Sequence, residues 1–400
     1  MKGEREIRFG AVARSLVVLV AAIAIGAAPA IGAGHGRHHH HHHHRHHGRH
    51  HHRHHHRHHR RRPTFAPPKG KVFHGVSDTR LGLPDVNLFK HQVGAHPAVL
   101  EDFYHWDTPL TTGALDRWQQ SRTRGILSLS TGPGGVRELI SPGQIASGRG
   151  DGYMIRLNQS IALSGQVVYI RLMPEMNGSW NRYGAYTVGG HPRNANHSTK
   201  MFRAAWQRFS IVVRGGTVRS INKRLRALKM PRLLRAKGAH DPVYSSAGVT
   251  DVLAKPKVAL IWSPQTISSP NVAGNQPKDY WPGKKYVDWV GADIYSKYAT
   301  PGVRAALSKF YARYRGVPFM IGEYSPWDND VNGSFVRWLF KWAKQHGRTR
   351  MLVYYRSVYS LSPYDIANFA KARGALRHIL DSPRYMQYAP GTRPHSHGRH

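Results

Sequence analysis

Two glutamates at the ends of predicted strands are the residues best placed to carry out chemistry. Residues 63–400 contain only four glutamates, namely Glu101, Glu138, Glu175 and Glu323. Glu175 closes the run VVYIRLMPE and Glu323 closes the run PFMIGE, and both runs have the apolar, β-branched composition of strands. Two carboxylic acids can cleave a glycosidic bond, because one protonates the leaving oxygen while the other attacks or activates water. This pair is therefore the first candidate for a catalytic centre.

Tryptophans near predicted strand ends indicate what such a centre binds. Trp180, Trp262, Trp281 and Trp327 all follow predicted strands. Aromatic rings stack on the apolar faces of sugars, whereas any one tryptophan taken alone is as often a core residue. Because the four cluster after neighbouring strands, we expect Trp180, Trp262 and Trp327 to contact a sugar substrate.

Eight short apolar runs alternate with longer helical patterns, which predicts an α/β fold with a parallel sheet. We expect strands near residues 71–76, 99–103, 125–129, 167–173, 258–262, 287–291, 318–322 and 351–355, and helices near 113–123, 154–163, 199–213, 302–314 and 334–345. Eight strands in about 290 residues fit a (β/α)8 TIM barrel. We assign this domain to residues 70–385 and a disordered C-terminal tail to residues 386–400.

Strand alternation predicts which side chains point into the barrel, because successive residues of a strand face opposite sides. In the first glutamate run, Val168, Ile170 and Leu172 should face the helices, while Tyr169, Arg171, Met173 and Glu175 should point inward. In the second run, Phe319, Ile321 and Glu323 should share the inward face. Active sites of these barrels lie at the carboxyl ends of the strands, where both glutamates are expected.

Three segments resemble the signatures of glycoside hydrolase family 26. They are RLMPEMNGSW (171–180), YWPGKKYVDWVGADIY (280–295) and PFMIGEYS (318–325), in the order and spacing of that family. The family belongs to the retaining-hydrolase clan of (β/α)8 barrels and contains mainly endo-β-1,4-mannanases, with β-1,3-xylanases and mixed-linkage β-glucanases. The resemblance implies a retaining endo-β-glycosidase that acts on mannan or a related β-glycan and needs no cofactor.

The resemblance also implies roles for individual residues. Glu175 would be the general acid/base and Glu323 the nucleophile. Tyr295 would hold the nucleophile by a hydrogen bond, and Asp293 would lie beside it at a binding position. Arg171 and Trp180 match the arginine and tryptophan that flank the acid/base.

Other positions bear on the identity of the glycan. The family usually has histidine before the acid/base, where this chain has Pro174, and the end of the third strand reads Ser128-Leu129-Ser130-Thr131 where mannanases tend to carry another histidine. Both departures affect sugar binding and leave the glutamate pair intact. Tyr355 and Arg356 follow the eighth strand and are candidate substrate contacts, with a structural role equally open.

Residues 1–34 have the layout of a secretory signal. Basic residues precede an apolar run from Ser15 to Ala28, and Ala28-Pro29-Ala30 fits a cleavage site. The alternative is an uncleaved anchor, although the run is shorter than the roughly 20 residues that a membrane span needs. We therefore expect a secreted or cell-surface protein with no stable membrane span after cleavage.

A low-complexity segment follows the signal. Residues 35–62 contain 18 histidines and eight arginines, a composition too poor in apolar side chains to fold. We expect disorder over residues 35–69, which end in a proline-rich linker. Imidazoles such as those of His38, His39 and His40 can bind metal ions loosely, and a functional metal or surface tether and a tolerated repeat are both open. We expect no metal site in the barrel itself.

The net charge of +38 suggests an anionic partner. Residues 63–400 account for +28 of it, so the barrel is basic as well as the tail. No nucleic-acid-binding motif accompanies the charge. We expect a monomer that binds a polysaccharide, with an anionic cell wall or acidic glycans as further partners and no nucleic acid.

Two further alternatives stay open. The basic segment 219–237 predicts a helical insertion, either as a solvated helix face or as a contact for an anionic polymer. The alternative to an enzyme is a non-catalytic exoprotein that binds polysaccharide or cell surface and carries a metal-binding tail. The absence of cysteine excludes disulfides, thiolate metal sites and a cysteine nucleophile.

Overall fold

A computed structural model describes residues 63–77, 83–133, 137–233, 252–327, 330, 332–356 and 363–392. The predicted signal at 1–34, the His/Arg-rich segment at 35–62 and residues 393–400 lie outside the described residues. None of the helices within these ranges is both long and apolar enough to cross a lipid bilayer.

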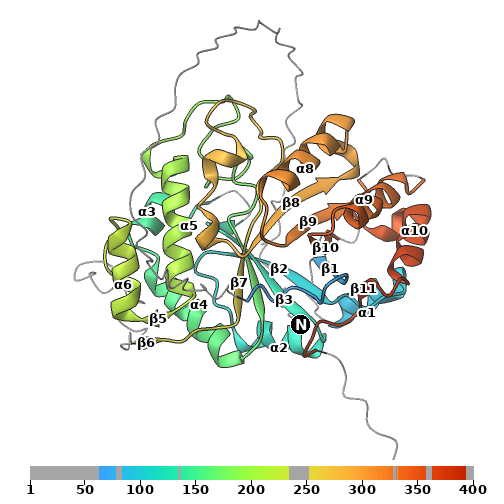
Figure 1. The fold of residues 1–400 in the computed structure, drawn as a ribbon, viewed down its shortest axis with the longest axis horizontal. Coiled ribbons are helices and arrows are strands. Elements are labelled where there is room, and N and C mark those ends of the chain that lie inside the picture. The colour runs from blue at the N-terminus through green and yellow to red at the C-terminus, as the bar shows by residue number, and fades with distance from the viewer. Residues whose placement is uncertain are drawn as a thin grey trace, which may run out of the picture. The chain divides into compact units, whose positions relative to one another are not determined.

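Eight parallel strands form a closed barrel (Figure 1). They are β1 (Val72–Ser77), β2 (Val99–His105), β3 (Arg124–Ser130), β4 (Val168–Leu172), β7 (Val258–Trp262), β8 (Trp289–Tyr295), β9 (Phe319–Ser325) and β10 (Thr349–Tyr354). Each strand pairs in parallel with the next, and pairing of β10 with β1 closes the ring. All eight predicted strands are present, which confirms the (β/α)8 barrel.

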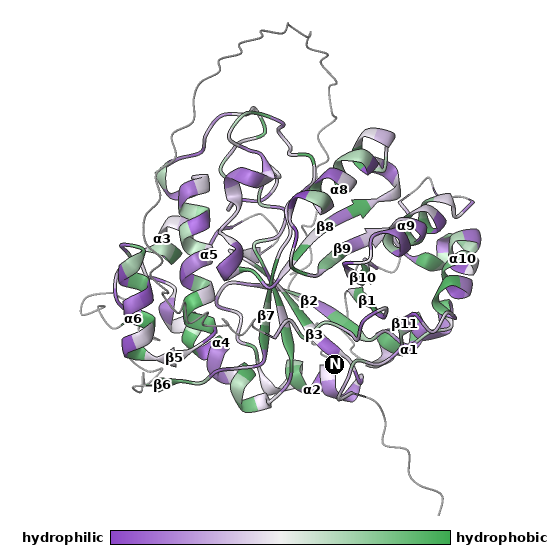
Figure 2. Cartoon of the chain, in the orientation of Figure 1, coloured by the Kyte–Doolittle hydropathy of each residue, from purple (hydrophilic) through white to green (hydrophobic). Residues whose placement is uncertain are grey.

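Helices surround the strands (Figure 1). They are α1 (Leu83–Val93), α2 (Thr112–Gln120), α3 (Pro142–Ala146), α4 (Asp151–Ser164), α5 (Thr199–Val213), α6 (Val218–Ala227), α8 (Pro301–Arg313), α9 (Ser334–Gln345) and α10 (Ala370–Leu380), with short 3-10 turns η2 (Ala195–His197), η3 (Pro277–Tyr280), η4 (Lys284–Tyr286), η5 (Ser296–Tyr298) and η6 (Ile366–Asn368). Three minor strands complete the chain: β11 (Tyr385–Met386) pairs with β1, while β5 (Gly216–Thr217) and β6 (Val252–Leu253) pair with each other. The strands are the most hydrophobic elements, and polar residues lie on the outer helices (Figure 2).

Two buried apolar layers follow from strand alternation. One fills the barrel and is formed by inward side chains, among them Phe73, Val99, Ile126, Tyr169, Ile261, Trp289, Met320 and Met351. The other lies between strands and helices, and it includes Val168, Ile170 and Leu172. The predicted alternation along β4 is therefore confirmed from Val168 to Leu172.

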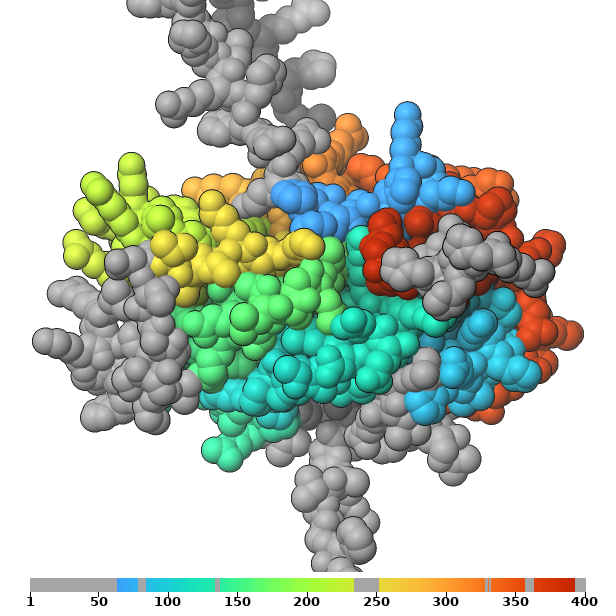
Figure 3. All heavy atoms as spheres, turned by 90° about the horizontal axis from the view of Figure 1, so that it is seen from below, coloured from blue at the N-terminus to red at the C-terminus, as the bar shows by residue number. Residues whose placement is uncertain are grey.

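The amino-terminal end of the barrel is closed by segments predicted to be disordered. In residues 63–69, two backbone carbonyls accept hydrogen bonds from the Tyr169 hydroxyl (2.6 Å) and the Trp289 indole (2.7 Å) inside the barrel. In residues 386–392, Ala389 is buried in the same layer. Figure 3 shows the first described residues beside the last ones. The predicted domain boundaries are thus too narrow: proline-rich chain can order itself where its carbonyls satisfy buried donors.

The basic insertion is shorter than predicted. Helix α6 ends at Ala227, and Lys229 has a left-handed backbone (φ 57°) that ends helical continuation. Pro231 follows, and proline cannot extend a helix because it lacks a backbone N–H. Residues 234–237 of the predicted helix lie outside the described residues.

Candidate active site

One buried arginine links side chains from four strands. Arg171, on the inward face of β4, is fully buried. Its Nη1 donates to Glu101 Oε1 at 2.6 Å and to Glu323 Oε1 at 2.9 Å, and its Nη2 donates to both oxygens of Asp293 at 2.7 and 2.9 Å. These partners come from β2, β9 and β8. The guanidinium offers five donors in a rigid plane, which suits it to order several carboxylates at once.

A β-bulge aims Glu323 into the barrel. The partner strands pair with Ile321 and then with Tyr324, so that Gly322 and Glu323 together oppose the single residue Asp293 of β8. A bulge of this kind re-aims one side chain without breaking the sheet. The prediction that Phe319 and Ile321 share the face of Glu323 is wrong, because both lie in the outer layer.

Gly322 makes the bulge compatible with the buried arginine. A Cβ atom at this position would lie 2.5 Å from Asp293 Oδ1 and 2.8 Å from Arg171 Cζ. Any side chain larger than hydrogen would therefore push apart the ion pair beside Glu323. The glycine is required here for space.

Each carboxylate oxygen of Glu323 accepts a hydrogen bond. Oε1 accepts from Arg171, and Oε2 accepts from the hydroxyl of Tyr295 at the end of β8. The side chain is nearly buried, with 12 % of its surface exposed. The contact between Tyr295 and Glu323 agrees with the arrangement implied by the family resemblance.

Glu175 reaches the site by a turn that departs from strand geometry. Met173 (φ 46°) and Glu175 (φ 53°) both have left-handed backbones, which costs a non-glycine residue about 1–3 kcal/mol. The turn sends Met173 into the outer layer, so the prediction that Met173 points inward is wrong. The Trp180 indole donates to Glu175 Oε2 at 3.0 Å, and the Gln265 amide donates to Oε1.

Asn177 joins the turn that carries Glu175 to the loop after β7. Its amide donates to the carbonyl of Gln265 (2.9 Å) and the hydroxyl of Ser268 (2.9 Å), and its Oδ1 accepts from the Gln265 backbone (2.8 Å). Both Asn177 and Ser268 are buried. These bonds hold Gln265 against Glu175, so the asparagine of the segment RLMPEMNGSW has a positioning role.

Burial and crowding of like charges keep protons on this cluster. Burial, with the charges of Asp293 and Glu323, raises the pKa of Glu175 well above its usual range, against the lowering effect of the Trp180 N–H and Arg171. Burial also raises the pKa of Glu101 to about 8 and that of Asp293 to about 7, although Arg171 opposes both. A hydrogen bond with Glu175 lowers the pKa of Asp293, as expected if the Glu175 carboxyl is the donor.

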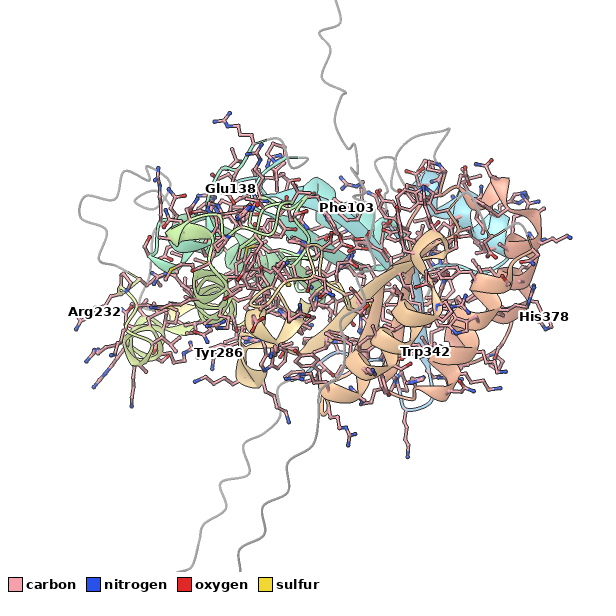
Figure 4. The ribbon with its side chains drawn as sticks, turned by 90° about the horizontal axis from the view of Figure 1, so that it is seen from above. Phe103, Glu138, Arg232, Tyr286, Trp342 and His378 are labelled. Atoms are coloured by element: carbon pink, nitrogen blue, oxygen red, sulfur yellow. The ribbon has the colours of Figure 1, made fainter. Side chains whose placement is uncertain are left out.

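Aromatic side chains form a wall beside the nucleophile candidate. Tyr295 has edge contacts with Trp327 (5.7 Å between ring centroids) and Tyr355 (5.9 Å), and Tyr355 in turn contacts Phe103 of β2 (5.9 Å). Phe103 is 49 % exposed, and Figure 4 shows where it lies on the molecule. An aromatic ring this exposed at the carboxyl end of a strand is suited to stack on a sugar.

Two predicted substrate contacts do not join the site. Trp262 is fully buried on the helix side of β7, where its ring packs against Trp281 (4.9 Å), Phe310 (5.9 Å) and Tyr314 (5.0 Å). This placement contradicts the predicted sugar contact, because alternation along β7 sends Trp262 outward with Leu260.

The second is Arg356. Its Nη1 donates to Asp85 of α1 at 2.9 Å, so the described contact of this guanidinium is with a helix and not with the carboxylates. This contact favours the structural alternative that the sequence left open.

Three residues of the site were missed from the sequence. Glu101 and Phe103 share the inward face of β2 with Val99. Their positions at every second residue of VLEDF could have predicted that both point into the barrel. Gln265 lies in an irregular loop after β7, where no sequence pattern marks it. Among the described residues, no group of three or more His, Asp or Glu side chains is arranged to hold a metal ion.

Comparison with known proteins finds similarity at the level of structure. No protein-family model and no curated protein sequence matches the chain. Similar solved structures include the YdhT protein from Bacillus subtilis (15% identity, TM-score 0.48, covering 81% of this chain and 88% of that one) and GH26A from Muricauda sp. (14%, 0.46, 81% and 93%). A Bacillus subtilis mannanase, BCman, matches at 14% identity with a TM-score of 0.46, covering 78% of this chain and 86% of that one. Such identities and scores are too low to assign a function, which has to come from the site itself.

Replacing Arg171 by methionine should destabilise the fold in a pH-dependent way. At pH 9, where Glu101 and Asp293 are largely ionised, the change leaves these buried carboxylates without their cation, and we expect the free energy of unfolding to fall by about 3–5 kcal/mol. Acid protonates the two carboxyls as the pH falls through their pKa values of about 8 and about 7, so the deficit should shrink. Urea unfolding at pH 9 and pH 5 measures both effects, with Arg171→Lys as the charge-retaining control. An equal deficit at both pH values would contradict this electrostatic role.

Gly322→Ala tests the space beside the bulge. The added methyl group should displace the Asp293–Arg171 pair and lower the free energy of unfolding by about 1–3 kcal/mol. Gly302→Ala is the matched control, because a Cβ there meets only Thr300 Oγ1 at 3.9 Å. Thermal unfolding of the two variants should separate them clearly, and equal stabilities would refute the assigned role of Gly322.

Proposed function

We propose that this protein is a secreted retaining endo-β-glycosidase. The observation that carries the proposal is the contrast between two carboxyl groups at one buried arginine. The pKa of Glu175 is raised by burial and by neighbouring acids, as a proton donor requires. Glu323 has Arg171 and Tyr295 on its two oxygens, as a nucleophilic carboxylate requires.

The mechanism proposed for this pair is double displacement. Glu323 attacks the anomeric carbon while Glu175 gives its proton to the leaving glycosidic oxygen, so that one sugar chain departs and the other is bound covalently to Glu323. Glu175, now ionised, takes a proton from water, and the resulting hydroxide displaces Glu323 from the sugar. The enzyme returns to its starting protonation, and the configuration at the anomeric carbon is retained.

The substrate proposed is a β-linked polysaccharide, with β-1,4-mannan or a related β-glycan as the first candidates. The exposed Phe103 contacts Tyr355, and both Tyr355 and Trp327 contact Tyr295, which supports binding of sugar rings on the side of Glu323. Pro174 stands where the resembling family usually has histidine, so mannan is one member of the panel to be tested and not a fixed assignment. We place the protein outside the cell, as its amino-terminal sequence predicts.

Replacement of each glutamate tests the proposal directly. The natural chain is screened on mannan, xylan, β-glucans and acidic polysaccharides, and the anomeric configuration of the first product is followed by NMR. On the substrate that is cleaved, Glu175→Ala should lower kcat by about 10²–10⁴-fold through loss of acid/base catalysis. Glu323→Ala should abolish turnover, because no glycosyl-enzyme can form.

Glu138→Ala is the matched control and should keep full activity. Of the four glutamates in residues 63–400, Glu138 is the one that is neither a proposed catalytic residue nor a partner of Arg171, and it pairs with His197. Full activity of Glu323→Ala, or inversion at the anomeric carbon, would disprove the mechanism. Binding of a polysaccharide without any turnover would instead support the non-catalytic alternative.

Trp180→Phe should move the alkaline limb of the pH–activity profile to higher pH. The indole N–H stabilises the ionised form of Glu175 and so lowers its pKa. Removing that donor raises the pKa further, and the acid stays protonated to a higher pH. The position of the limb in kcat/KM is measured, because a mere loss of sugar contact would reduce activity without moving it. A shift to lower pH would contradict the assignment of Glu175 as the acid.

A further inference from the structure

Acidic and basic side chains are separated in this barrel. Among the described residues, the acidic side chains that are exposed are Asp107, Asp116 and Asp381. Most of the buried acids are paired internally, as Asp151 with Arg208 and as the carboxylates around Arg171. Among the described residues, the positive excess therefore lies mainly on the surface. A surface so poor in acids has few internal partners for its lysines and arginines.

The positive charge is most concentrated on α6 and the turn after it. Exposed cations there are Arg219, Lys223, Arg224, Arg226, Lys229 and Arg232. We call this set the α6 cation row. The sequence contains no acidic residue between Glu175 and Asp241, so Arg219, Lys223 and Arg226 have no acid near them in sequence. Within the described part of the chain, none of Arg219, Lys223 and Arg226 forms an ion pair.

Helix geometry lines these cations up along one exposed side. Val218, Ile221 and Leu225 are buried and fix the helix against the barrel. Arg219, Lys223 and Arg226 follow at spacings of four and three residues, which places neighbouring side chains about 5–6 Å apart on the same side of a helix. Together they span about 10 Å along the helix axis. This is a linear array of positive charges, held in place by a buried apolar stripe.

The α6 cation row is separate from the candidate active site. In Figure 4, Arg232 lies at the outer edge of the molecule, whereas Phe103 lies near its centre. Helix α6 packs on α5 and on the minor strand β5, at the outside of the barrel (Figure 1). A polymer bound there would leave the aromatic wall and the glutamates free.

We propose that the α6 cation row binds a flexible linear polyanion outside the cell, a polymer whose repeating units carry phosphate or carboxylate groups. Guanidinium forks match both groups in geometry and charge. Single-stranded nucleic acid, itself a flexible polyanion, is the less suitable ligand, because residues 214–233 contain no aromatic side chain on which bases could stack. The row would retain the protein on an anionic matrix while the barrel stays open to its substrate.

The test compares two variants of the full chain that lose the same charge. One carries Arg219→Gln, Lys223→Gln and Arg226→Gln, and the other carries Lys309→Gln, Lys341→Gln and Lys344→Gln, three exposed lysines of α8 and α9. The arginines of residues 35–62 are replaced by glutamine in both, so that the tail does not mask the contrast. Binding to poly(glycerol phosphate), to polygalacturonate and to single-stranded DNA is measured against salt concentration, at pH 8 where histidine is neutral.

The α6 variant should bind the preferred polymer at least about 10-fold more weakly at low salt, with a salt dependence that is smaller by about two charges. The α8/α9 variant should lose less than about 3-fold. The two polymer arms identify phosphate or carboxylate as the ligand group. Equal losses in both variants would overturn the proposal, because binding would then depend on total charge. Preference for DNA over both polymers would also overturn it.

Polyanion binding at the α6 cation row is independent of the proposed hydrolysis. The Glu323→Ala variant should bind the polyanion as well as the natural chain does, whether or not the natural chain has any glycosidase activity. Melting temperatures of the two charge variants within a few degrees of the natural chain confirm that each is folded.

Discussion

A single buried guanidinium sets the constraints on the rest of the site. Arg171 has no access to water, and removing a charge from water costs more than one ion pair returns unless every donor is satisfied. Glu101, Asp293 and Glu323 satisfy it from three strands, and Ser263 accepts from its Nε at 3.3 Å. Strands β2, β8 and β9 do not pair with β4, and these polar contacts tie them to it across the interior of the barrel.

The same arrangement explains the electrostatics of the carboxyl groups. Glu101, Glu175, Asp293 and Glu323 surround one positive charge, so full ionisation would leave a large negative excess in a buried volume. Retained protons relieve that excess, and the raised pKa values of Glu101, Glu175 and Asp293 express it. Glu101 Oε2 is buried and has no hydrogen-bond partner among the described residues, so no donor stabilises the ionised form at this oxygen. The raised pKa that a proton donor needs is thus a property of the cluster and not of Glu175 alone.

The sequence predicted the parts of this protein that follow strand periodicity and failed where the backbone departs from it. The eight strands, the outward set Val168, Ile170 and Leu172, and the inward Arg171 all obey alternation. Glu323 points inward only because of a bulge, and Glu175 only because of left-handed residues, so simple alternation assigned their neighbours Phe319, Ile321 and Met173 to the wrong face. For Trp262 the opposite happened. Alternation along β7 places it correctly in the outer layer, but the prediction of a sugar contact followed its residue type instead. Gln265 depends on contacts between two loops, which no local pattern encodes.

Both ends of the described chain lie at the closed amino-terminal end of the barrel, which decides how the protein can be attached to a surface or a fusion partner. Residues 63–69 and 386–392 both finish on the face where the strands begin, and their carbonyls and apolar side chains complete that face. The candidate site lies at the opposite end of the strands. A chain joined before Pro63 or after Thr392 therefore starts from the far side of the barrel, so a fusion partner, a bead or a cell wall could hold the protein by either end and leave its mouth facing outward.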